Sequence, residues 1–147
     1  MIIGLIGLGE MGSEIGRYLV MNDLEVISVY EGRSEISKKR ASKYKIRDAG
    51  SIEQFCKISD LVISIIPPDK AIETANLYTS YKNKDGQIYC DLNAISTITA
   101  KKIKLLLDEK KIDYVDKCEE NKEFGKNSSQ KNASIMFAQR PKDGRCH

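Results

Sequence analysis

The sequence predicts a single α/β domain built on a doubly wound, mostly parallel sheet. Short apolar runs alternate with stretches of helical periodicity between residues 1 and 116, and the run at 60–66 is continuously apolar, as in strands buried on both faces. A glycine-rich turn directly follows the first apolar run. Strands and helices that alternate in this way form parallel sheets with right-handed crossovers, and 147 residues are enough for one such core.

The first half of the chain predicts a β-α-β unit followed by two shorter elements. Apolar residues set the first strand, and a helical period begins within the glycine-rich turn. The predicted elements are a strand at Ile2–Ile6, a helix at Met11–Met21, a strand at Glu25–Tyr30, a helix at Ser34–Tyr44, a short element at Lys45–Arg47 and a helix at Ile52–Lys57.

The second half continues the alternation. Pro67 and Pro68 end the apolar strand, because proline has no N–H to donate, and Asp85-Gly86 is a turn signal before the next strand. The predicted elements are a strand at Asp60–Ile66, a helix at Lys70–Tyr81, a strand at Gln87–Asp91, a helix at Thr97–Lys111 and a strand at Asp113–Asp116.

The pattern stops after Asp116, so the predicted domain covers residues 1–116. Residues 117–130 are rich in Lys, Glu, Asn and Ser, and Phe124 is their only large apolar side chain. Such a composition buries too little apolar surface to fold. We therefore expect 117–147 to be a polar, poorly ordered tail of a truncated chain, with one short strand or turn at Ile135–Ala138.

Composition argues against several classes of protein. No apolar run approaches the ~20 residues of a membrane span, and no signal peptide is evident, so we expect a cytoplasmic protein without membrane contact. The 24 Lys and Arg are interleaved with 21 Asp and Glu, which argues against nucleic-acid binding. Cys56, Cys90, Cys118 and Cys146 lack Cys-x-x-Cys spacing and His147 is the only histidine, so no metal site is expected. We expect Cys56 and Cys90 to pack as small apolar groups.

The glycine-rich turn has the form Gly-x-Gly-x-x-Gly inside one β-α-β unit, which predicts a dinucleotide-binding domain of the Rossmann type. Gly7 would allow the tight turn, Gly9 would admit the pyrophosphate, and Gly12 would let the helix pack closely. The helix N-terminus would offer N–H groups and its dipole to the phosphates. The alternative is a glycine turn without a ligand. The predicted cofactor-binding residues here are Gly7, Leu8, Gly9, Glu10, Met11 and Gly12.

The end of the second strand bears on the choice between NAD and NADP. An acidic side chain there binds the ribose 2′-hydroxyl, whereas an arginine accepts a 2′-phosphate. Glu31 lies near the expected ~20 residues from the glycines, but Arg33 and Ser34 offer a charged fork and a hydroxyl suited to a phosphate. The sequence therefore favours NADP over NAD. The alternatives are a solvated loop charge for Arg33 and a helix N-terminal charge for Glu31.

Two further loops are expected to border the same crevice, because ligands of doubly wound sheets lie at the carboxyl ends of the strands. One loop contains Ile66, Pro67 and Pro68, and the other, Asp91–Ala94, contains Asn93. The alternatives are a strand terminator for the prolines and a helix-capping segment for the second loop.

These motifs resemble one family. Ile3–Gly12, with its Gly-Leu-Gly-x-Met-Gly form, is similar to the opening of the 6-phosphogluconate dehydrogenase and 3-hydroxyisobutyrate dehydrogenase family, the β-hydroxyacid dehydrogenases. Ser59–Pro67 resembles the family's fourth strand and proline loop, and Asp91–Ser96 resembles its substrate-side Asp-x-Ser-Thr segment. The resemblance covers residues 1 to about 116 and implies hydride transfer between a nicotinamide cofactor and a small hydroxyacid. Relatives with Arg-Thr after the second strand use NADP, and Arg33-Ser34 is similar.

The chain also departs from the family pattern. Asn93-Ala94 stands in place of Ser-Thr, Thr97 in place of proline, and Gly32 is an extra residue. The family's interdomain helix and helical domain with the catalytic lysine have no recognisable counterpart, so no catalytic residue is assigned. Three functions remain open: the cofactor half of a hydroxyacid dehydrogenase, an NADP-binding module without turnover, or a structural Rossmann-like domain without a ligand. The module would be a degenerate fragment or one half of a complex with a separate helical chain. The expected protein partners are a second copy, as a homodimer, or that helical chain.

Overall fold

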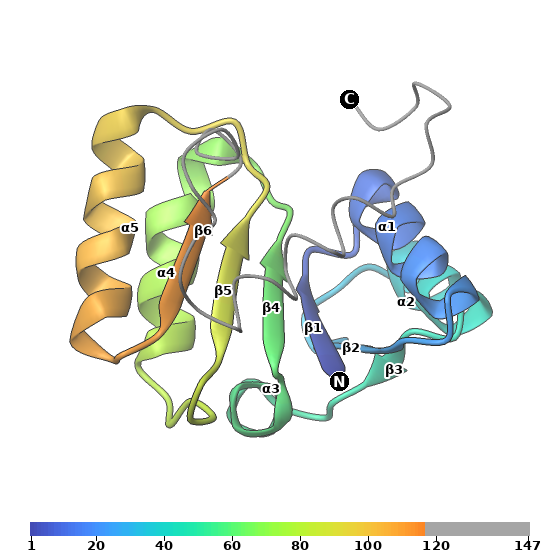
Figure 1. Ribbon diagram of the computed structural model, residues 1–147. Coiled ribbons are helices and arrows are strands. Elements are labelled where there is room, and N and C mark those ends of the chain that lie inside the picture. The colour runs from blue at the N-terminus through green and yellow to red at the C-terminus, as the bar shows by residue number, and fades with distance from the viewer. Residues whose placement is uncertain (117–147) are drawn as a thin grey trace.

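The computed structural model describes residues 1–116, which form strands and helices in strict alternation (Figure 1). Residues 117–147, with the predicted tail and the predicted strand at Ile135–Ala138, lie outside the described residues. The strands are β1 (Ile2–Ile6), β2 (Glu25–Ser28), β3 (Arg47–Asp48), β4 (Leu61–Ser64), β5 (Ile88–Asp91) and β6 (Asp113–Asp116). The helices are α1 (Glu10–Met21), α2 (Glu35–Lys43), α3 (Ile52–Ile58), the 3-10 turn η1 (Pro68–Lys70), α4 (Ala71–Thr79) and α5 (Thr97–Glu109).

The six strands form one sheet in the order β3-β2-β1-β4-β5-β6, and every neighbouring pair is parallel. This confirms the doubly wound α/β fold that the sequence predicts. The order reverses on either side of β1, which pairs with β2 on one side and with β4 on the other. Ligands of open α/β sheets bind outside the carboxyl ends of the strands at such a reversal. The topology therefore places the crevice where β1 and β4 end.

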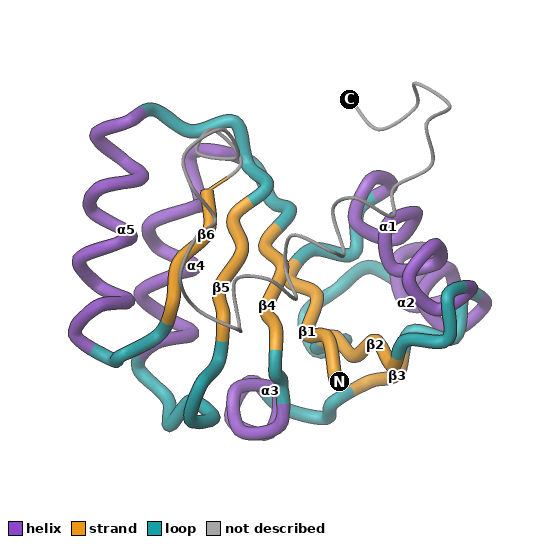
Figure 2. Tube along the Cα trace, in the orientation of Figure 1, coloured by secondary structure: helices purple, strands orange, loops and turns teal. Residues whose placement is uncertain are grey.

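Side chains that alternate along the strands build two cores. Ile3 and Leu5 of β1 belong to one core with Leu19 and Ala41, whereas Ile6 belongs to the other core. The second core also contains buried residues of α3, α4 and α5. Figure 2 shows α1 and α2 next to each other beyond β1, and α4 and α5 together at the other end of the sheet. Burial of both faces explains why β4 has the continuous apolar sequence noted above.

Serine side chains begin three of the helices. The hydroxyl oxygens of Ser34, Ser51 and Ser96 accept hydrogen bonds from backbone N–H groups three residues later, at 3.1–3.2 Å. These bonds satisfy donors that the first turn of a helix leaves without a partner. Helix α1 differs, because its N-cap is Gly9 and no side chain caps it.

Predicted and observed element ends differ where a tertiary contact intervenes. β4 ends at Ser64 rather than Ile66, because the Ile66 N–H leaves the ladder and donates to a side chain. β3 begins only at Arg47, since the Ile46 N–H donates to Ala41 and closes the end of α2. α4 is also shorter than the predicted helix at Lys70–Tyr81 and is preceded by the 3-10 turn η1.

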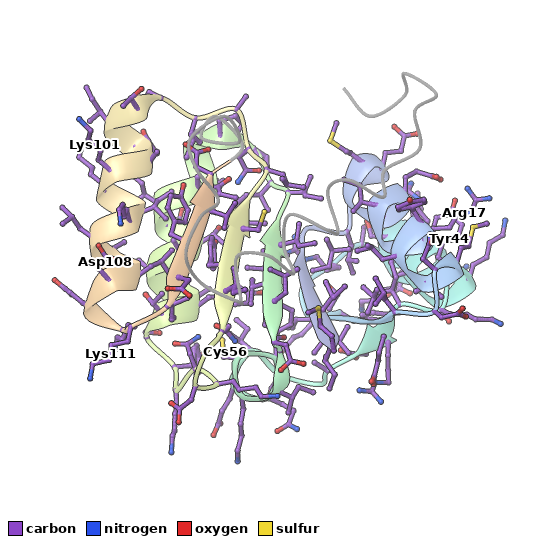
Figure 3. All side chains as sticks on the ribbon, in the orientation of Figure 1. Arg17, Tyr44, Cys56, Lys101, Asp108 and Lys111 are labelled. Carbon is purple, nitrogen blue, oxygen red and sulfur yellow. The ribbon has the colours of Figure 1, made fainter. Side chains whose placement is uncertain are left out.

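A buried amide joins three segments at the amino ends of the strands. Gln87, only 1% exposed, donates from Nε2 to the carbonyls of Cys56 (3.0 Å) and Ser59 (2.9 Å), and its Oε1 accepts from Asn83 (3.1 Å). Figure 3 labels Cys56, a residue of α3, at this end of the molecule. The hydrogen bonds of Gln87 therefore lie at the opposite edge of the sheet from the crevice.

Within residues 1–116, no helix combines the length and the apolar character that crossing a membrane requires.

Candidate functional site

Two of the three glycines in the turn after β1 are required by the protein itself. Gly7 has φ +107°, and a Cβ there would lie 1.9 Å from the Ile65 carbonyl oxygen. A Cβ on Gly12 would lie 2.1 Å from the Gly7 carbonyl oxygen. Gly9 is different, because no described atom outside Gly9 and its two chain neighbours lies within 4 Å of its ideal Cβ position. The absence of a side chain at Gly9 thus leaves open space in front of α1 rather than relieving an internal clash.

The N-terminus of α1 faces that space with free donors. The Ser13 N–H makes the first helical bond, to the Gly9 carbonyl at 2.9 Å, so the N–H groups of Glu10, Met11 and Gly12 have no acceptor in the helix. The Ser13 hydroxyl donates to the Leu8 carbonyl at 3.0 Å and holds the turn. Free N–H groups and the positive dipole end make an anion site. Glu10 and Met11 contribute backbone here, since both side chains are exposed.

Two adjoining cavities lie at the carboxyl ends of β1, β2 and β4. The first, which we name the turn cavity, has a volume of about 320 Å³, and the second, the α4 cavity, about 410 Å³. They share Gly32, Arg33, Ile66 and Pro67. The turn cavity is also lined by Gly7, Leu8, Gly9, Ser34, Ser37 and Ile65. The α4 cavity is also lined by Ile6, Val29, Glu31, Ile52, Lys70, Glu73, Thr74, Leu77 and Tyr78.

The loop after β2 places a cation between the two cavities. The Arg33 N–H donates to the Tyr30 carbonyl at 3.0 Å, and Gly32 has φ +78°, so the extra glycine closes a tight turn that favours glycine. Within residues 1–116 neither the Arg33 guanidinium nor the Glu31 carboxylate has a hydrogen-bond or ion-pair partner. Burial raises the pKa of Tyr78 to about 12, and the nearby Arg33 opposes that rise. Arg33 is therefore a free cation at the junction of the cavities.

Two hydroxyls lie beside Arg33 in the turn cavity. Ser34 and Ser37 are one helical turn apart, and their side-chain oxygens are 3.0 Å from each other. Ser34 also accepts from the Ser37 N–H as the cap of α2. An arginine fork with adjacent hydroxyls and a helix N-terminus can surround a phosphate group with donors.

The loop Ile65–Pro67, which we name the β4 loop, forms a wall of both cavities, and Asn93 holds it from behind. Asn93 is 3% exposed and lines neither cavity. Its Oδ1 accepts from the Ile66 N–H at 2.7 Å, and its Nδ2 donates to the Ser64 hydroxyl at 3.3 Å. Pro68 lies in η1, outside the lining of both cavities.

A buried carboxyl group supports Asn93. Asp91 is 1% exposed, and its Oδ1 accepts from the Asn93 N–H at 2.8 Å. Burial raises the pKa of Asp91 to about 6; the bond from Asn93 opposes the rise, and Asp116, its register partner on β6, adds to it. Burial also raises the pKa of Tyr89 and Tyr114, which lie on the same two strands.

Among the described residues no group of three or more His, Cys, Asp or Glu side chains could hold a metal ion. Cys56 and Cys90 are buried in the two apolar cores, as predicted, and burial raises the pKa of Cys56 to about 12. Cys118, Cys146 and His147 lie outside the described residues.

The structure brings most of the predicted site residues together. Those that line the cavities are Gly7, Leu8, Gly9, Glu31, Arg33, Ser34, Ile66 and Pro67. Glu10, Met11 and Gly12 begin α1 beside them, whereas Pro68 and Asn93 lie behind the cavity walls. Sequence reasoning missed Ser37, Lys70 of η1 and the α4 residues Glu73 and Thr74. The three-residue spacing of Ser34 and Ser37 was a usable signal, but α4 carries none, because its position depends on packing.

The sequence profile of one family, described as the NAD binding domain of 6-phosphogluconate dehydrogenase, matches residues 2–118. The uncharacterized 28.5 kDa protein in the 7S RNA 5′ region of Methanothermus fervidus is 36% identical over 116 residues, which are 79% of this chain and 44% of that protein. The chain thus spans less than half the length of this relative.

Solved structures share the fold at low identity. Mycobacterium tuberculosis 3-hydroxyisobutyrate dehydrogenase superposes with a TM-score of 0.67 at 19% identity, covering 78% of this chain and 39% of that enzyme. An imine reductase from Myxococcus stipitatus in complex with NADP+ also has a TM-score of 0.67, at 18% identity, covering 79% of this chain and 40% of the reductase. These superpositions show a shared fold.

Proposed function

Because this chain belongs to the family of NAD-binding domains of 6-phosphogluconate dehydrogenase, we propose that it binds NADP as the cofactor-binding part of an oxidoreductase acting on a small hydroxyacid. The observation that carries the proposal is the open space at Gly9, in front of the uncapped N-terminus of α1 and next to the free guanidinium of Arg33. The N-terminus of α1 and the Arg33 guanidinium, which both favour anions, adjoin the α4 cavity, which is large enough for a nucleoside.

The pyrophosphate, the 2′-phosphate and the adenosine of the dinucleotide each have residues suited to them. The backbone of Gly7–Gly9 and the first turn of α1 would hold the pyrophosphate. Arg33, Ser34 and Ser37 would hold the 2′-phosphate, and the α4 cavity, with apolar walls such as Ile52 and Leu77, would take the adenosine. The bound nicotinamide would supply the hydride chemistry, while this chain binds and orients it. We assign no acid–base group among residues 1–116.

The preference for NADP follows from charge. A 2′-phosphate places about two negative charges beside Arg33, whereas NAD offers a 2′-hydroxyl that a carboxylate such as Glu31 would bind. Glu31 and Arg33 both line the α4 cavity, but only Arg33 also lines the turn cavity with Ser34 and Ser37. The grouping of Arg33 with two hydroxyls supports NADP.

Replacing Arg33 by alanine tests this choice. We expect the NADPH dissociation constant to rise about 10-fold to 100-fold, because hydrogen bonds to charged groups contribute about 1.5–3 kcal/mol each, and the NADH constant to change less than about threefold. Isothermal titration calorimetry of the full chain with both nucleotides measures the two constants.

Arg17→Ala is a matched control for the lost charge. Arg17 lies on α1 against the Tyr44 ring, 5.6 Å from its centroid, and lines neither cavity (Figure 3). The NADPH affinity of Arg17→Ala should equal that of the original chain. The cofactor would instead be NAD if the original chain bound NADH more tightly than NADPH. In that case Glu31→Ala should weaken NADH binding and Arg33→Ala should leave it unchanged. Binding without hydride transfer from any small hydroxyacid to NADP+ would favour the module without turnover.

A further inference from the structure

Asn93 uses all of its polar groups within the protein. Besides the bonds of its side chain to Ile66 and Ser64, its N–H donates to Asp91 at 2.8 Å and its carbonyl accepts from the Ile95 N–H at 3.0 Å. Asn93 is 3% exposed and lies outside the lining of both cavities, so it presents no polar atom to a ligand bound there. Asn93 therefore acts on its neighbours and does not contact the cavities.

What Asn93 holds is the wall that both cavities share. The Ile66 N–H lies beyond the end of the β4 ladder, and in the described chain Asn93 Oδ1 is its acceptor. The next residue, Pro67, has no N–H with which to anchor the loop. Without the amide of Asn93, the β4 loop would have a partly buried donor without a partner, and its backbone would shift to reach water.

A shift of the β4 loop would be transmitted to the glycine turn. The Ile65 carbonyl oxygen lies 1.9 Å from the point where Gly7 would carry a Cβ, so the two loops are in close contact. The contacts thus run from Asn93 through Ile66 and Ile65 to Gly7, whose turn precedes the open space at Gly9.

We propose that Asn93 is a positioning residue, which fixes the β4 loop against the glycine turn and so sets the affinity for the dinucleotide without touching it. This inference rests on the proposed function. It also assigns to the loop after β5 an effect on cofactor binding, because the same residue joins both loops.

Asn93→Leu tests the proposal, because leucine has a similar size but makes no hydrogen bond. We expect the NADPH dissociation constant to rise at least about tenfold, the effect of losing about 1.4 kcal/mol. Gln87→Leu is the matched control, since Gln87 is another buried amide that joins backbone segments, at the opposite edge of the sheet. It should lower the denaturation midpoint to a similar extent and leave the NADPH constant within twofold.

Two measurements keep the test decisive if Asn93→Leu folds poorly. Ser64→Ala removes the 3.3 Å hydrogen bond from Asn93 Nδ2 but keeps the bond from Asn93 to the β4 loop, and it should weaken NADPH binding less than threefold. Asn93→Ser keeps a small polar group that is too short to span both partners, and it should give an intermediate constant. Unchanged NADPH affinity in both folded Asn93 variants, or an equal loss of affinity in Gln87→Leu, would overturn the positioning role.

The amide signals of Gly7 and Gly9 separate this inference from the proposed function. In spectra of the chain without nucleotide, Asn93→Leu should shift both signals and Gln87→Leu should shift neither. If the original chain binds no dinucleotide, the proposed function fails, and these shifts still decide whether Asn93 positions the turn. Unmoved glycine signals in Asn93→Leu would contradict the contact path directly.

Discussion

Gly9→Val is expected to weaken dinucleotide binding about 100-fold while leaving the fold intact. The valine side chain would fill the space in front of the first turn of α1 without meeting any described atom within 4 Å of its Cβ. Losing two charge-assisted bonds to a phosphate, at about 1.5 kcal/mol each, corresponds to about a 100-fold rise in the dissociation constant. Because valine is a poorer N-cap than glycine, the free energy of unfolding should fall by less than about 1 kcal/mol. Calorimetric titration with NADPH and urea denaturation measure the two effects.

Gly12→Ala, in contrast to Gly9→Val, is expected to destabilise the fold. Its Cβ would lie 2.1 Å from the Gly7 carbonyl oxygen, so the backbone must move to admit it. Overpacking of this kind costs about 1–3 kcal/mol, and the denaturation midpoint should fall accordingly.

If Gly9→Val bound NADPH as tightly as the original chain, the open space at Gly9 would not be the pyrophosphate site.

Asp91→Asn is expected to stabilise the protein at neutral pH. Burial of Asp91 raises its pKa from 3.8 to about 6, and a difference of roughly 2 units corresponds to about 3 kcal/mol. Asparagine is neutral and keeps an oxygen to accept from the Asn93 N–H. The free energy of unfolding at pH 7.5 should therefore rise by about 2–3 kcal/mol, measured by urea denaturation.

The sign follows from proton binding. A raised pKa means that the folded chain binds the proton of Asp91 more tightly than the unfolded chain does. The contribution of Asp91 is fully favourable below about pH 3.8 and is lost as the pH rises through about 6. The gain from Asp91→Asn should accordingly fall below about 1 kcal/mol at pH 4. An equal gain at pH 4 and pH 7.5 would show that ionisation of Asp91 is not its source.

Asp60→Asn is expected to lower the free energy of unfolding at neutral pH, the opposite of the effect of Asp91→Asn. Burial pushes the pKa of Asp60 upward, but the Ile2 N–H at 2.7 Å and the Lys84 ammonium at 2.6 Å outweigh it and lower the pKa. This contribution is present above the unfolded pKa and is lost as the pH falls. Asp60→Asn should therefore destabilise the chain at pH 7.5 and match it more closely at low pH.

Local sequence predicted the elements well where local rules decide. β1 and β6 have the predicted bounds, because strand β1 is followed at once by glycines and β6 by a change in composition. The glycine turn, the end of β2 and the β4 loop were predicted to form one crevice, and residues of all three line the two cavities. The rule that parallel strands present their carboxyl ends at one edge was sufficient for this.

The parts that sequence reasoning missed depend on contacts between distant segments. Asn93 and Ile66 are joined by a side-chain bond across 27 residues, and nothing in the residues around Asn93 distinguishes a ligand contact from a loop support. Thr74 lines the α4 cavity because α4 packs beside α5, and that packing fixes the rotation of the helix. Gly32 was visible only as an extra residue, although its φ of +78° shapes the turn that presents Arg33.

The central place of β1 has a consequence for how the chain folds. β1 leaves the ribosome before β4 and must pair with it on one side, so that Ile3 meets Leu61, 58 residues later in the chain. Until that segment has been synthesised, one edge of β1 and the apolar side chains of β1 remain unpaired. Contacts this far apart slow folding and prolong the exposure of aggregation-prone strands. Closure of the β1–β4 pair should therefore be the slow step, and chaperones should engage the nascent chain before residue 64 emerges.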